Sequence, residues 1–128
     1  EFIASYDTQR FYTNQKCFII TSKNENLTYL TALLNSKLNF WYFKQIGATL
    51  GANGYEMSKI FVEKLPIPKI TKENQNLVDE LVKLVNQILA LKGQISSADT
   101  NKLEKDIDNL IYKLYNLSPN DIKIIERV

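Results

Sequence analysis

Side chains able to contact a nucleic acid are concentrated around a glycine-rich stretch in the first half of the chain. Three of the four glycines, Gly47, Gly51 and Gly54, lie there among amide, hydroxyl and ammonium groups. Such groups donate to phosphates and base edges, and glycine lets the backbone approach a duplex closely. The candidate contact residues are Lys44, Gln45, Thr49, Asn53, Tyr55 and Lys59. Polar glycine-rich loops are also common as solvated connections, so composition alone leaves both interpretations open.

A second, smaller group of polar residues lies upstream, between two segments rich in aromatic and β-branched residues. Phe11-Tyr12 and residues 17–21 have strand composition, and the polar residues between them have turn composition. We therefore predict a short strand or hairpin here. Asn14 and Lys16 in this turn are further candidates for DNA contact, with a plain solvated turn as the alternative.

Histidine and the common nucleotide-binding motifs are missing. The chain has no histidine, so the usual general base and zinc ligand are absent, and it has neither of the glycine motifs that cradle nucleotide phosphates. Asp121-Ile122-Lys123 has the acidic-x-Lys pattern that holds a metal and a water in some nucleases. The same residues also fit a capped helix start after Ser118. We expect no catalytic residue, metal ligand or bound cofactor in this chain.

Composition predicts one modest globular unit. The chain has 128 residues, of which 45% are hydrophobic, and a formal net charge of only +2. Residues 1–70 carry eight basic and five acidic side chains, a net charge of +3, so an anion-binding face belongs to the first half. The single cysteine, Cys17, favours a reducing, cytoplasmic setting. No apolar run approaches the ~20 residues that cross a bilayer, so we expect a soluble protein without a membrane partner.

Helical spacing of apolar residues follows the first polar loop. Asn26 is placed to cap a helix that carries Leu27, Leu30 and Leu33, and Asn35-Ser36 interrupts it. A second helix with aromatic residues then runs to Gly47. After the glycine-rich stretch, Leu65-Pro66-Ile67-Pro68 must be extended, because each proline restricts both itself and the residue before it.

The second half of the chain has the pattern of two long helices and a short one. Leucine and isoleucine recur in alternating steps of four and three over residues 77–95 and again over residues 103–117. A short polar break joins these segments, so we predict an antiparallel helix pair over residues 74–95 and 101–117. Ser118, Pro119 and Asp121 then have the order of a helix start.

The order of these features resembles a known domain family. Residues 26–38, the run Phe40-Trp41-Tyr42-Phe43, the glycine-rich stretch and residues 61–68 together are similar to the TaqI-like C-terminal specificity domain. That domain occurs in adenine-specific DNA methyltransferases and fused restriction-modification enzymes, and it is similar to the target-recognition domains of type I restriction specificity subunits. Residues 103–117 and 122–126 resemble the tail that commonly ends such enzymes.

The resemblance implies an α+β, helix-rich fold. A small α/β target-recognition module would occupy residues 1–71, and an antiparallel helix pair with a short C-terminal helix would form a spacer or docking segment over residues 72–128. The implied partners are double-stranded DNA and an N-terminal methyltransferase domain of the same polypeptide. That parent would use S-adenosylmethionine to methylate adenine, and it could also carry an endonuclease. The Asn-Pro-Pro-aromatic signature of such methyltransferases is absent here, so this part would be non-catalytic.

A different class of function fits the second half of the chain. The long leucine pattern could be intermolecular as readily as internal. The alternative is therefore a helical protein-interaction module that docks a partner or a second copy and has no DNA specificity.

Overall fold

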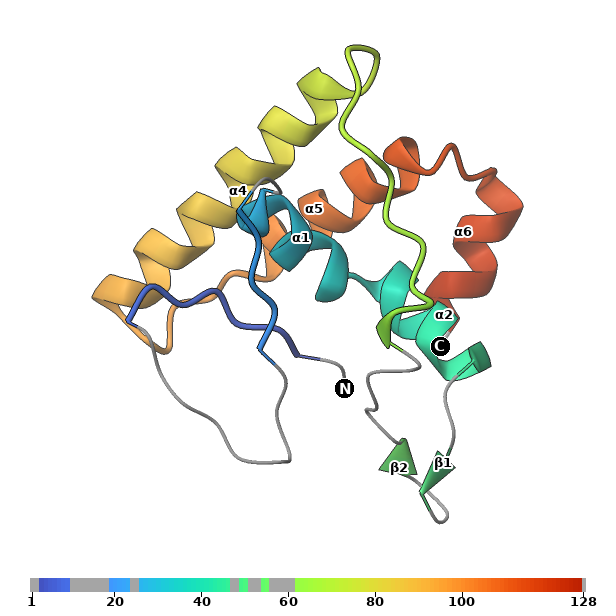
Figure 1. Cartoon of the computed structure of the whole chain (residues 1–128), viewed down its shortest axis with the longest axis horizontal. Helices are drawn as coiled ribbons and strands as arrows, with labels where there is room; N and C mark the ends of the chain where they lie inside the picture. The colour runs from blue at the N-terminus through green and yellow to red at the C-terminus, as the bar shows by residue number, and fades with distance from the viewer. Residues whose placement is uncertain are drawn as a thin grey trace.

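The computed structural model describes residues 3–9, 19–23, 26–46, 49–50, 54–55 and 62–127. Five helices dominate these residues (Figure 1). They are α1 (Leu27–Leu34), α2 (Lys37–Ile46), α4 (Gln75–Gln94), α5 (Asn101–Leu114) and α6 (Pro119–Glu126). The strands β1 (Thr49–Leu50) and β2 (Gly54–Tyr55) form a small antiparallel hairpin between α2 and the proline-containing segment.

The prediction of an α+β fold with an α/β recognition module is wrong, because the described protein is helical. Strand pairing in the described ranges is confined to β1 and β2, with two residues on each side, and these form no layer of a core. The apolar faces of α1 and α2 are covered by helices of the second half instead, so they need no sheet. Of the predicted upstream strand, residues 10–18 lie outside the described residues, and Ile19 and Ile20 are exposed and belong to no strand.

Local signals placed the helix ends as predicted. The Asn26 side chain accepts a hydrogen bond from the Tyr29 N–H at 3.0 Å and caps α1. α1 then ends at Leu34, and α2 begins at Lys37 after two intervening residues. At the other end of the chain, Ser118 and Asp121 form a reciprocal capping box that opens α6. These capping predictions are confirmed.

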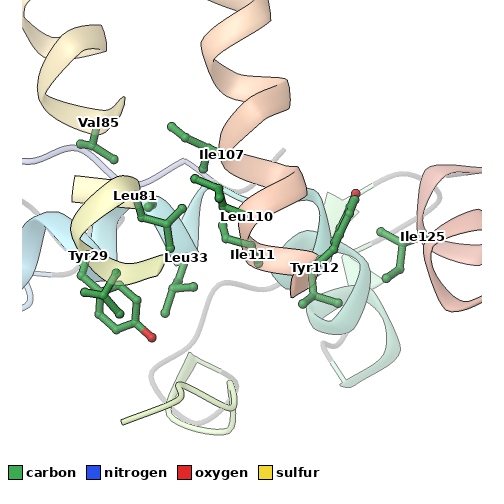
Figure 2. Packing of buried hydrophobic residues seen from close by; sticks show 12 residues of the cluster. Tyr29, Leu33, Leu81, Val85, Ile107, Leu110, Ile111, Tyr112 and Ile125 are labelled. Carbon is green, nitrogen blue, oxygen red and sulfur yellow. The ribbon is translucent and has the colours of Figure 1, made fainter. Parts of the chain in front are cut away.

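One hydrophobic core joins the two halves of the chain. Leu33 of α1, Leu81 of α4 and Ile111 of α5 are fully buried in it. Figure 2 shows Leu33 lying toward Leu81 and Ile111, with Tyr29 at one end of the cluster and Tyr112 and Ile125 at the other. Burying a side chain of this size stabilises the fold by about 1.5–3 kcal/mol. We call this cluster the main core.

The predicted helix pair is present, but fewer of its apolar residues are buried than the leucine pattern indicated. α4 and α5 pack together and run in opposite directions (Figure 1). Val78, Leu81 and Val85 of α4 are buried, whereas Leu91 and Ile95 are 41% and 62% exposed. The apolar pattern therefore continues past the part of α4 that the other helices cover.

Buried polar groups at the junction of α1 and α2 hold these two helices against α5. The Ser36 hydroxyl donates to the Leu33 carbonyl and accepts from the Asn39 N–H. The carboxylate of Asp108, on α5, accepts from the Lys37 N–H at 3.0 Å, at the first residue of α2. Because a helix start leaves its first N–H groups without partners, this long-range bond both caps α2 and sets its angle to α5.

Candidate nucleic-acid interface

The stretch that carries most candidate contact residues is anchored at both ends by a second, smaller cluster. Leu34, Phe43 and Leu65 are buried together there, with partly buried Ile46 and Val62 against them. Phe43 and Ile46 lie at the end of α2, and Val62 and Leu65 lie where the chain returns. We call these residues the loop-base cluster. It holds the two ends of the segment from which the β1–β2 hairpin projects beyond α2 (Figure 1).

The last turn of α2 presents two candidate contact residues. Gln45 is exposed, and Lys44 is half-buried with its ammonium nitrogen 4.8 Å from the centre of the Phe40 ring. A cation is attracted to an aromatic face, and a lysine in the last turn of a helix also interacts favourably with the helix dipole. Lys44 is therefore held in a restricted position on the side of the molecule where the hairpin begins.

Two more candidate contact residues lie opposite each other in the hairpin. Thr49 of β1 lies opposite Tyr55 of β2, and Leu50 lies opposite Gly54. Lys44 and Gln45 precede this pair by a few residues, so the structure brings four candidates to one end of the molecule. The remaining candidates, Asn14, Lys16, Asn53 and Lys59, lie outside the described residues.

The segment after the loop forms what we call the proline strap, residues 65–70. It belongs to no helix or strand, as its prolines predict. The Tyr29 hydroxyl donates to the Pro68 carbonyl at 2.9 Å, the Tyr115 hydroxyl donates to the Pro66 carbonyl, and the Asn74 amide donates to the Lys69 carbonyl at 2.9 Å. Burial raises the pKa of both tyrosines, so both hydroxyls remain protonated donors at neutral pH.

Sequence reasoning gave Tyr29 and Tyr115 no role. The available signal was the strap itself, because an extended segment without a partner strand leaves its carbonyls to accept from side chains or water. The sequence does not say which side chains supply them, since Tyr115 is far from Pro66 along the chain.

Just over half of the chain matches a known protein family. Residues 1–67 match the TaqI-like C-terminal specificity domain. The chain belongs to this family. Searches of curated proteins and of solved structures gave no match. Membership places the chain among domains that give DNA sequence specificity in restriction-modification systems.

The matched part of the specificity domain contains α1, α2 and the hairpin, and it ends within the proline strap. Helices α4, α5 and α6 lie beyond the match, yet they supply most of the main core against which α1 packs. The matched part of the chain thus packs against helices that follow it.

Two acidic residues of α6, beyond the matched part, have structural partners. The acidic-x-Lys pattern of Asp121 and Lys123 indicated a nuclease centre as an alternative, but Oδ2 of Asp121 accepts from the N–H and hydroxyl of Ser118 within the capping box. Glu126 accepts from the Tyr112 hydroxyl at 2.8 Å, which lowers the pKa of the carboxyl, and from the Lys37 ammonium at 3.3 Å. These bonds hold α6 against α2 and α5.

None of the helices in the described ranges combines the length and the apolar character that a membrane span requires.

Proposed function

We propose that this chain reads the sequence of double-stranded DNA for an adenine-N6 DNA methyltransferase that precedes it in the same polypeptide. The observation that carries the proposal is the family match, which covers the helices and hairpin that bring candidate contact residues to one end of the molecule. The parent is either a methyltransferase or a methyltransferase fused to an endonuclease. Its catalytic domain would bind S-adenosylmethionine and turn the target adenine out of the duplex, as enzymes that modify bases do.

The proposed division of roles follows from side-chain chemistry. Amide groups such as Gln45 and Asn53 would bond base edges, and lysines such as Lys44 and Lys59 would contact phosphates. Thr49 and Tyr55 would add hydroxyl contacts from the hairpin, and Asn14 and Lys16 would add contacts from the upstream segment. Residues 1–71 would recognise the DNA, and residues 72–128 would hold that part at a fixed angle to the catalytic domain.

Selection from a randomised duplex library tests the proposal directly. The immobilised chain is incubated with the library at physiological salt, and the retained duplexes are sequenced. Enrichment of one short motif is the expected result, because base-edge contacts discriminate between sequences whereas phosphate contacts do not. Retention of random sequence with the composition of the input would reject sequence recognition.

One observation favours a second role, in protein docking. Leu89, Leu91 and Ile95 are 39%, 41% and 62% exposed at the C-terminal end of α4. Exposed apolar side chains near one end of a helix can mark a contact surface. If this surface pairs with a second copy, the molecular mass measured by light scattering during size exclusion will rise with concentration. A monomer at all concentrations would contradict self-association.

A further inference from the structure

Two tyrosines from different helices hold the proline strap where backbone partners are lacking. Proline has no N–H, and no strand in the described part of the chain pairs with residues 65–70. Two of the strap carbonyls instead accept hydrogen bonds from tyrosine hydroxyls. The hydroxyl of Tyr29, on α1, donates to the Pro68 carbonyl, and the hydroxyl of Tyr115, at the end of α5, donates to the Pro66 carbonyl. These bonds join the strap to both halves of the main core.

The strap is also the end of the segment that carries the hairpin. Leu65, its first residue, is only 7% exposed and packs with Leu34 and Phe43 in the loop-base cluster. Phe43 lies near the end of α2, from which the same segment departs. The position of Leu65 thus fixes one end of the hairpin segment relative to the other. Movement of the strap at Pro66 would draw Leu65 away from this cluster.

Resting on the proposed function, we propose that Tyr29 and Tyr115 are positioning residues for DNA recognition. Their hydroxyls hold the proline strap, and the strap holds the end of the segment from which the hairpin presents its contact residues. Neither tyrosine needs to touch DNA in this arrangement. A contact loop whose ends are fixed loses less conformational freedom on binding, so it binds its preferred sequence more tightly than a loosely held one.

The first test measures the hairpin without DNA. Tyr29→Phe combined with Tyr115→Phe removes the two hydroxyls and keeps both rings in place. We expect hydrogen exchange at the backbone amides of residues 49–50 and 54–55 to become about 10-fold faster. The matched control is Tyr112→Phe, which removes another tyrosine hydroxyl but breaks a bond to Glu126 on α6. Exchange in the hairpin should change less than twofold in that control (about 0.4 kcal/mol).

The second test measures selectivity. Wild-type protein, the double variant and the Tyr112→Phe control are each carried through selection from the same randomised duplex library. We expect enrichment of the wild-type motif to fall about 10-fold in the double variant and to stay within about twofold in the control. Equal enrichment by the double variant and the wild type, with unchanged hairpin exchange, would overturn the assignment.

The two tests separate failure of this inference from failure of the proposed function. If the wild type enriches no motif, the proposed function is rejected and the tyrosines have no recognition role to support. If the wild type enriches a motif and both variants enrich it equally, the proposed function stands and the positioning role is rejected. A loss of enrichment in the control as large as that in the double variant would also reject it, because the effect would then be one of general stability.

Discussion

At the scale of single residues, Asp108 shows what a buried carboxyl contributes and costs in this fold. It is 7% exposed and accepts from the Lys37 N–H at the start of α2. Burial raises its pKa, the Lys37 N–H and ammonium lower it by less, and Glu126 and Glu104 add to the rise. The hydrogen bond positions α2, while the charge on the same carboxyl is unfavourable in the folded protein.

Asp108→Asn should separate these two effects, because it keeps an acceptor oxygen and removes the charge. A carboxyl whose pKa is raised by folding holds its proton more tightly in the folded state. Stability of the wild type relative to the variant should therefore increase as pH falls from the raised pKa toward the ordinary carboxyl value of about 3.9. Urea unfolding of both proteins at a series of pH values measures this difference.

Asp108→Ala provides the control for the hydrogen bond. It leaves the Lys37 N–H without its acceptor and should cost about 1–3 kcal/mol throughout the pH range. The difference in free energy of unfolding between the wild type and Asp108→Asn should grow as pH falls. A difference that stays constant with pH, or that decreases as pH falls, would contradict a raised pKa for Asp108 in the folded protein.

Lys44 is the residue-scale test of phosphate contact. Lys44→Ala should weaken binding to every duplex by a similar factor and reduce the slope of log affinity against log salt by about 0.9. Fluorescence anisotropy at several salt concentrations gives both quantities. Lys83→Ala on α4 is the matched control, since Lys83 is exposed on a helix away from the hairpin. Equal slopes for the wild type and both variants would remove Lys44 from the interface.

At the scale of elements, the sequence was sufficient where local chemistry decides the structure. Three helix ends could be predicted, because each depends on residues next to it in the chain. They are the cap at Asn26, the break at Asn35-Ser36 and the capping box at Ser118. The mixed fold was predicted wrongly because the partner of an apolar helix face is chosen over long distances, and α1 packs on α4. For the same reason, Tyr29 and Tyr115 could not be assigned to the proline strap beforehand.

The capping box of α6 gives a prediction at this scale. Ser118→Ala removes the acceptor of the Asp121 N–H and should lower the free energy of unfolding by about 1 kcal/mol. Thermal unfolding followed by circular dichroism measures this loss. Ser97→Ala, at an exposed turn residue, should change the stability by less than about 0.5 kcal/mol. A loss in Ser118→Ala no larger than in this control would mean that the cap does not hold α6.

At the scale of the whole molecule, the part proposed to recognise DNA and the helices that support it share one hydrophobic core. Leu33 belongs to the part that matches the family, whereas Leu81 and Ile111 lie in the helices beyond it. The proposed division at residue 71 is therefore a division of roles. We expect residues 1–71 and 72–128 to unfold together, because α1 would lose its main partner if α4 opened, and α2 would lose its contacts with α5.

Leu33→Ala tests this coupling. It should lower the free energy of unfolding by about 2–5 kcal/mol, since it leaves a cavity at a fully buried site. Fluorescence of the single tryptophan, Trp41 on α2, and helical circular dichroism should report the same transition in the wild type and in the variant. Leu91→Ala, at a 41% exposed leucine, is the matched control and should cost far less. Two separate transitions would contradict a shared core.

The measurement that tests DNA reading most directly is a pair of affinities. Dissociation constants are determined at physiological salt for the duplex obtained by selection and for a scrambled duplex of the same composition. Sequence recognition predicts that the selected duplex binds about 1,000-fold more tightly or better, as specific complexes do. Equal dissociation constants for the two duplexes would contradict the claim that this chain provides DNA sequence specificity.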